Sequence, residues 1–426
     1  MMDWIIKELQ WKAGIYRKTG MLRVFDIGVV KSDTVISNQV QQALKDAVIP
    51  LESLPEDQKD FHPGSDQKVV DLVHPSLFPV IYGRTRVLPD RVIGVDDCID
   101  SMGQGQLIPI PSDADATPDI FESYGSHRLA VSPLSQRFQW LPCDIELTEH
   151  SKCRIVSYIN NAHPVKHRAL YGVVEDVIAK ALPLWNQSLT EKPFRSDRIK
   201  FVEVEYGESS EPEPIYPEDA GDDFDEEACF ERFEAWEASR PIRICATAIY
   251  YYDSENITES ALGFRQRGMS DMNDINYEQD RHEFLQEVYG LREDVDGRNA
   301  AHITQELGNV LCKEGRLITF PNTLQHRVLP FSLADRSKPG HRKILALFLV
   351  VPHRRIVSSA NVPPQREDWT PEDPERQDGV TEDIPSSLMT MAEAKEHRVA
   401  IMEERGLRHN RQNESFEVSS FSLCEH

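Results

Sequence analysis

The stretch 315–331, GRLITFPNTLQHRVLPF, decides how we interpret the fold. It is typical of two short β-strands joined by a turn, because apolar and β-branched residues flank Pro321 and Asn322. The second strand begins with His326, and alternate residues of a strand face the same side, so His326 and Val328 share a face. A single histidine is usually structural. The question is therefore which other residues would make His326 a metal ligand.

Further β-like segments surround this stretch, which suggests a core of antiparallel strands. They are IRICATAIYYY at 242–252, SALGFRQR at 260–267 and RKILALFLVV at 342–351. A stripe of apolar residues at helical spacing predicts a helix over 170–185, and further helices are predicted at 2–19, 34–48 and 387–405, the last capped by Gly406. The stretch 274–309 is expected to be polar and partly helical. These elements favour an α+β protein with a barrel or jelly-roll core and amphipathic helices packed outside.

The composition indicates how the chain is divided. Of the net charge of −24, a large part lies in residues 203–237, which hold 15 acidic residues and one basic residue. We therefore interpret that segment as a solvated insert and expect no nucleic-acid partner. The expected organisation is a mainly helical region (1–200), an acidic linker (201–241), an incomplete β core (242–357), a Pro/Asp-rich linker (358–385) and a C-terminal helix and tail (386–426).

The cellular setting is predicted from cysteines and apolar runs. The chain has seven scattered cysteines and no C-x-x-C pair, which favours reduced thiols in the cytoplasm, with the nucleus as a second possibility. We expect no membrane association, because no run of about 18 apolar residues occurs. A secretory signal is not expected, because no basic segment followed by an apolar core opens the sequence.

Arg342 is the second residue of chemical interest. Period-2 alternation places it on one face of its strand with Ile344 and Phe348. An arginine that enters an apolar interior is costly unless it meets an anion, and its planar fork matches a carboxylate. Because the intervening segment 332–340, SLADRSKPG, is turn-like, we expect the strands of His326 and Arg342 to be antiparallel neighbours. They would then supply a possible metal ligand and a possible carboxylate anchor.

Several long motifs carry a family resemblance. They are DLVHPSLFPVIYGRT, YYYDSENITES, EGRLITFPNTLQHRVLPFSLADRSKPGHRKILALFLVVPHRR and SANVPPQREDW. Over roughly residues 70–405 the chain resembles the fungal family labelled domain of unknown function 4246. That family in turn resembles Fe(II)/2-oxoglutarate dioxygenases of the prolyl-hydroxylase type. The resemblance implies a double-stranded β-helix core, a His-x-Asp/Glu…His metal motif and a later arginine that holds the far carboxylate of 2-oxoglutarate.

The resemblance assigns roles to three residues. It makes His326 the distal iron ligand, Arg342 the anchor of 2-oxoglutarate and Tyr251 a second contact to the same carboxylate. The implied activity is hydroxylation or desaturation of a small-molecule or peptide substrate, with Fe(II) and 2-oxoglutarate as cofactors. The alternative is a non-catalytic barrel that is retained as a binding or scaffold module.

The chain departs from the family pattern at the proximal metal motif. No His-x-Asp/Glu precedes the tyrosine strand, and His282 and His302 are the only histidines between 168 and 326. On family spacing, Glu237 is the surviving carboxylate. A second interpretation fits better: a segment that carries the motif is absent at about 242–244. With one imidazole, we expect weak iron binding and little oxygenase activity. His282 and His302 are minor alternative ligands, whereas structural or substrate-side roles are expected for His74, His163 and His167.

Overall fold

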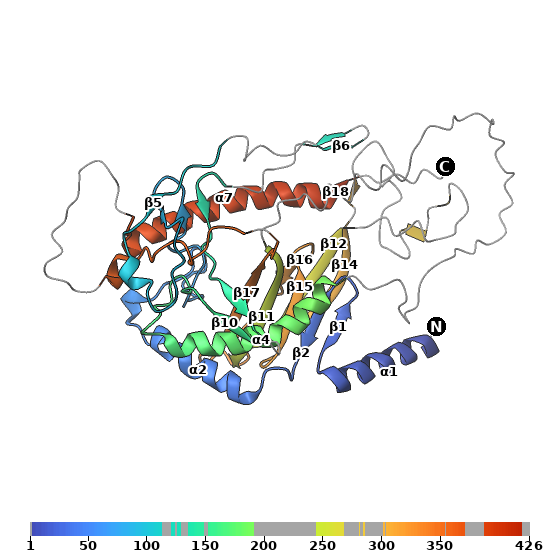
Figure 1. Cartoon of the computed structure of the whole chain (residues 1–426). Coiled ribbons are helices and arrows are strands. Elements are labelled where there is room, and N and C mark those ends of the chain that lie inside the picture. The colour runs from blue at the N-terminus through green and yellow to red at the C-terminus, as the bar shows by residue number, and fades with distance from the viewer. Residues whose placement is uncertain are drawn as a thin grey trace, which may run out of the picture.

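The computed structural model of the chain is shown in Figure 1. It describes residues 2–112, 121–123, 126–128, 135–148, 152–190, 244–267, 281, 284–285, 301–302, 304–353, 355–370 and 387–419. The acidic segment with Glu237 and most of the 358–385 linker lie outside these residues.

The centre of the fold is a five-stranded antiparallel sheet with the strand order β1-β2-β15-β11-β17. Its strands are β1 (Leu22–Phe25), β2 (Val29–Ser32), β11 (Ile244–Glu255), β15 (Leu317–Pro321) and β17 (His341–Val350). The strands predicted from 242–252, 315–321 and 342–351 are thus confirmed. The sheet also takes two strands from the N-terminal region, because Thr319 of β15 pairs with Val30 of β2.

Alternation along β11 divides the sheet into two apolar faces. Ala246, Ala248, Tyr250 and Tyr252 contribute to one hydrophobic cluster, whereas Ile249 and Tyr251 contribute to another. Since successive side chains of a strand point to opposite sides, both faces of β11 are buried. This explains why the strand reads as a nearly continuous apolar run.

Two helices cover the first face, as Figure 1 shows. They are α2 (Asn38–Glu52) and α4 (Arg168–Leu189). The predicted stripe of α4 is confirmed, since its residues Val177 and Ala181 are fully buried in the cluster on this face. The start of α2 is set by Ser37, whose hydroxyl accepts a hydrogen bond from the backbone N–H of Val40.

A second, three-stranded antiparallel sheet packs on the opposite face. It consists of β14 (Thr304–Leu311), β12 (Ala261–Arg267) and β16 (Gln325–Val328), in that order. One hydrophobic cluster joins both sheets, and the rings of Phe264 in β12 and Phe320 in β15 meet edge to face at 5.1 Å. The α+β prediction is therefore confirmed, and two facing sheets form its core. The first six residues of β14, 304–309, lie in the stretch expected to be polar and partly helical, and there the chain forms a strand instead.

The remaining described elements are short, apart from two helices. The helices are α1 (Met2–Thr19) and α7 (Met391–Glu417), with 3₁₀ turns at Glu56–Gln58, Ile99–Ser101 and Glu367–Trp369. The strands are β3 (Val80–Ile81), β4 (Arg86–Val87), β5 (Gln106–Leu107), β6 (Phe121–Ser123), β7 (Ser126–Arg128), β8 (Phe138–Gln139), β9 (Ile145–Leu147), β10 (Cys153–Ile155), β13 (Ala301–His302) and β18 (Val418–Ser419). In the part of the chain that the structure describes, no helix has the length and hydropathy needed to cross a bilayer.

The last helix, α7, runs along the side of the molecule opposite α4 (Figure 1). It continues through Gly406, so the predicted C-cap there is wrong. A glycine inside an exposed helix costs only about 1 kcal/mol, and good helix formers surround this one. Near its end, α7 reaches the small sheet, because the amide of Gln325 donates a hydrogen bond of 2.7 Å to Asn413.

Candidate functional site

Arg342 lies at the start of β17 on the face that looks toward the small sheet. Its guanidinium carbon is 4.2 Å from the centre of the Phe331 ring and 5.7 Å from that of Tyr251. Its Nη1 atom donates a hydrogen bond to the hydroxyl of Ser260. Among the described residues no carboxylate forms an ion pair with Arg342. The Arg342 guanidinium is therefore half-buried and packs on two aromatic rings, and it has no acidic partner among the described residues.

Tyr251 is the residue that sequence comparison paired with Arg342, and the structure brings the two together. Its side chain is 2% exposed and belongs to the cluster between the sheets. Burial raises the pKa of the Tyr251 phenol well above its usual range, the neighbouring Cys312 thiol adds to this, and the Arg342 charge offsets a small part. The hydroxyl therefore stays protonated and can act as a hydrogen-bond donor.

His326 points into the same space from the small sheet. It pairs directly with Phe264 of β12, so both side chains lie on the face that packs against the large sheet. Its ring centre is 4.7 Å from that of Phe320. The residue as a whole is exposed at the sheet edge, yet the protein around the ring desolvates it and lowers its pKa. The imidazole is therefore neutral near pH 7 and has a lone pair available to a metal or a donor.

The expected pairing of the His326 and Arg342 strands is wrong. The strand β16 pairs with β12 in the small sheet, whereas β17 pairs with β11 in the large sheet. The link between them is long enough for the chain to cross from one sheet to the other. The two groups still face the same space. Arg342 contacts Ser260, and His326 lies beside Phe264. Ser260 and Phe264 are four residues apart along the chain, which corresponds to about 13 Å in an extended strand.

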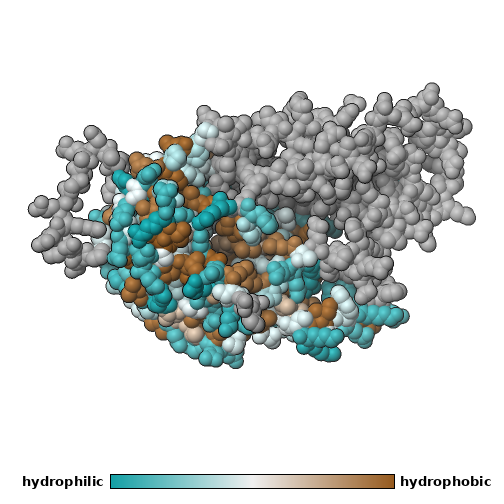
Figure 2. Space-filling model, in the orientation of Figure 1, coloured by the Kyte–Doolittle hydropathy of each residue, from teal (hydrophilic) through white to brown (hydrophobic). Residues whose placement is uncertain are grey.

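The inner face of β17 is open in the described part of the chain. Ile344 is 46% exposed and Phe348 is 42% exposed, although both are on the side that faces the small sheet. The indole of Trp140 lies 5.5 Å from the Phe348 ring, and Arg405 of α7 lies 3.7 Å above that indole. Figure 2, in the same orientation as Figure 1, shows hydrophobic patches between the positions of α7 and α4. Apolar surface of this kind is typical of a binding face.

The remaining candidates are Glu237 and the other histidines. Glu237 and His282 lie outside the described residues, and His302 lies in the short strand β13. His163 packs on the ring of Trp369 at 5.0 Å, and its Nδ1 accepts a hydrogen bond from the backbone of Val165, which agrees with a structural role. Iron does not fit at His326 on the described residues alone, because no group of three potential metal ligands among them includes His326.

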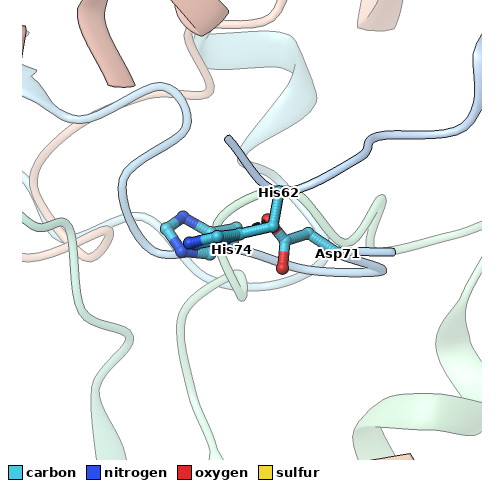
Figure 3. A group of neighbouring side chains, drawn as sticks. All are labelled: His62, Asp71 and His74. Carbon is cyan, nitrogen blue, oxygen red and sulfur yellow. Dashed lines mark hydrogen bonds and ion pairs between the residues drawn. The ribbon is translucent and has the colours of Figure 1, made fainter. Parts of the chain in front are cut away.

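One group of potential ligands was missed by sequence reasoning. His62, Asp71 and His74 converge in the loop that follows α2, and their potential ligand atoms all lie within 4.8 Å of one another (Figure 3). Their spacing in the sequence matches no metal motif, so only the folded loop shows the group. Burial lowers the pKa of His74, and the nearby Asp71 carboxylate opposes this shift.

The fold and the site define a class: an α+β protein in which an arginine, a tyrosine and a histidine lie on the facing sides of two antiparallel sheets. The model of one family, Protein of unknown function (DUF4246), matches residues 1–242 and 237–373. The chain belongs to this family. No curated protein and no solved structure matches it. The two matched segments meet at 237–242, directly before β11.

Proposed function

We propose that the space between the two sheets binds a dicarboxylic 2-oxoacid and that the protein is of the 2-oxoglutarate-dependent dioxygenase type. The position of Arg342 carries the proposal. Its guanidinium stands on the inner face of β17, held by Phe331 and Ser260, with no acidic partner among the described residues. A carboxylate would supply the missing anion and would bind the planar fork through two hydrogen bonds.

The position of His326 supports the same ligand. The distance of about 13 Å between the surroundings of Arg342 and those of His326 is of the order that a five-carbon dicarboxylate spans with a contact at each end. Tyr251 adds a protonated hydroxyl beside the anchor. The expected jelly-roll core agrees with this arrangement, since arginine and histidine would then enter from opposite sheets.

The strand edges indicate where the remaining ligands would belong. In the described residues β17 and β16 are edge strands of their sheets. Two additional strands could pair with these edges, and family resemblance places such strands, with the proximal His-x-Asp/Glu, directly before β11. The junction of the two family matches at 237–242 agrees with a missing segment. We derive no reaction step through iron, because the described residues offer it one imidazole.

A second candidate function follows from that single imidazole. Without a second ligand beside His326, the chain would retain oxoacid binding and lose turnover. The exposed inner face of β17 favours this alternative, since apolar surface at a closed active site would be covered. The protein would then be a carboxylate-binding module derived from an oxygenase.

Calorimetric titration with 2-oxoglutarate tests the proposal. We expect binding that is at least tenfold weaker in Arg342→Lys, because an ammonium lacks the bidentate fork. The matched control is Arg327→Lys, since Arg327 follows His326 in β16 and therefore points away from the space between the two sheets. Equal affinity in all three proteins would refute the assignment. Release of succinate on addition of Fe(II) and oxygen separates the enzyme from the binding module.

A further inference from the structure

We propose that His62, Asp71 and His74 form a binding site for a divalent transition-metal ion, separate from the space between the sheets. Two imidazoles and one carboxylate are donors that Zn²⁺ and related ions bind well. The group lies in the N-terminal region, in the loop between α2 and β3 (Figure 3). It includes neither Arg342 nor His326, so it does not depend on the proposed function.

The backbone of the loop brings the three side chains together. The N–H of Asp71 donates to the carbonyl of Asp60 at 2.8 Å, and the N–H of His62 donates to the carbonyl of Val69 at 2.9 Å. The chain reverses through Asp66 and Gln67, which both have positive φ angles. This two-stranded ladder places His62 beside Asp71, although nine residues separate them in the sequence.

The distances suit a shared ion after a small movement. His62 Nδ1 and Asp71 Oδ2 are 2.9 Å apart. Two neighbouring ligands of one ion, each about 2.1 Å from it, lie roughly 3.0–3.4 Å apart. The imidazole of His74 is somewhat more distant, within the 4.8 Å limit of the group. Since all three residues are half-buried, rotation of the His74 side chain can bring its nitrogen to the ion. Water molecules would fill the remaining coordination positions of the ion.

Other side chains hold the donors in place. Arg398 of α7 forms two hydrogen bonds with Asp60, at 2.6 and 2.9 Å, and a weaker one of 3.3 Å with Asp71. The amide of Asn161 donates to the carbonyl of His74 at 3.0 Å. Partners of this kind around a metal ligand restrict its orientation and raise its affinity.

Metal binding would replace the 2.9 Å hydrogen bond between His62 Nδ1 and Asp71 Oδ2 and two longer hydrogen bonds. One is the 3.3 Å contact of Arg398 with Asp71, and the other is the 3.2 Å bond from the N–H of Ser76 to His74 Nδ1. Arg398 would keep its shorter bonds to Asp60. Because these losses reduce the net gain, we expect a dissociation constant in the micromolar range, about −8 kcal/mol of binding free energy.

The test uses full-length protein freed of metal by a chelator, titrated with Zn²⁺ against a chromophoric competitor. We expect one site, weakened at least tenfold in His74→Asn and in Asp71→Asn. Two controls should retain it: His163→Asn, a structural histidine of the same region, and His326→Asn in the sandwich. If wild type does not bind Zn²⁺, or if His74→Asn and Asp71→Asn bind it as wild type does, the proposal is overturned.

A second measurement needs no variant, so a folding defect cannot obscure the result. Diethyl pyrocarbonate modifies accessible neutral imidazoles, and mass spectrometry maps the modified residues. We expect Zn²⁺ to protect His62 and His74, since a coordinated nitrogen cannot react, while His326 remains reactive. Unchanged labelling of His62 and His74 at saturating Zn²⁺ contradicts the site. Protection of His326 alone would assign the ion to the sandwich and overturn this inference.

Discussion

Arg398 and Asp60 form a bidentate ion pair that joins the C-terminal helix α7 to the loop after α2. The two hydrogen bonds measure 2.6 and 2.9 Å, and the Arg398 side chain is 3% exposed. Lys395 of the same helix lies 3.4 Å from Asp60. Residues more than 300 positions apart are thus held together by charge as well as by apolar packing, and the same arginine reaches Asp71.

We expect Arg398→Met to destabilise the protein by about 3 kcal/mol. Removal of one partner of a buried pair leaves the other charge desolvated, which costs several kcal/mol even when the new side chain fits. Urea denaturation followed by circular dichroism measures the change. The control is Arg154→Met, whose exposed pair with Glu146 should contribute little. A loss below 1 kcal/mol for Arg398→Met would show that this ion pair does not hold α7 in place.

Two glycines should respond in opposite directions to alanine. Gly28, between β1 and β2, has a φ of +103°, and a Cβ there would collide with the backbone carbonyl of Ser188 at the end of α4. We expect Gly28→Ala to cost about 2 kcal/mol or more, because the backbone strain alone is 1–3 kcal/mol. Gly172 lies within α4 with no atom near its Cβ position, so Gly172→Ala should stabilise the protein by about 0.5–1 kcal/mol.

Thermal unfolding of both variants measures this contrast. If Gly28→Ala melts at the wild-type temperature, β1–β2 and α4 do not approach each other as described. The contact between the N-terminal hairpin and the large sheet would then need revision.

Acid should weaken the protein through Asp253. Burial favours the protonated carboxyl, but hydrogen bonds from Lys45, His341 and Lys343 outweigh burial and lower the pKa to about 2, from an ordinary value of 3.8. A carboxylate with a lowered folded-state pKa stabilises the fold above its unfolded pKa, and this contribution is lost as pH falls toward the folded pKa. We therefore expect stability to fall between pH 4 and pH 2.

The variant Asp253→Asn isolates this contribution. It should be less stable than wild type at pH 7, and its stability should change less between pH 4 and pH 2. Urea midpoints measured at several pH values give both quantities. Parallel pH profiles for the two proteins would rule out Asp253 as a source of the acid sensitivity.

Local patterns predicted the four long helices and five of the eight strands in the two main sheets, because their signals lie within a few residues. The stripe in α4 and the alternation in β17 are examples. Long-range partners carry no such signal. The pairing of β2 with β15, for instance, depends on contacts between residues nearly 290 positions apart, such as Val30 and Thr319. The same limit explains the wrong expectation that β16 and β17 are neighbours.

Some of the candidate site residues could be predicted from the sequence, and others could not. Family resemblance pointed to Arg342 and Tyr251, and the structure places them together. His62 and Asp71 were not foreseen, because a backbone ladder, and not a spacing motif, makes them neighbours. Glu237 lies outside the described residues, so its role stays a prediction.

The central claim is that Arg342 binds the far carboxylate of a 2-oxoacid, and a cycle of two ligands and two proteins tests it most directly. Binding of 2-oxoglutarate and of 2-oxobutyrate, which lacks that carboxylate, is measured for wild type and for Arg342→Ala. We predict that wild type prefers 2-oxoglutarate at least tenfold, about 1.4 kcal/mol, and that Arg342→Ala loses this preference. A variant that keeps the full preference would contradict the account.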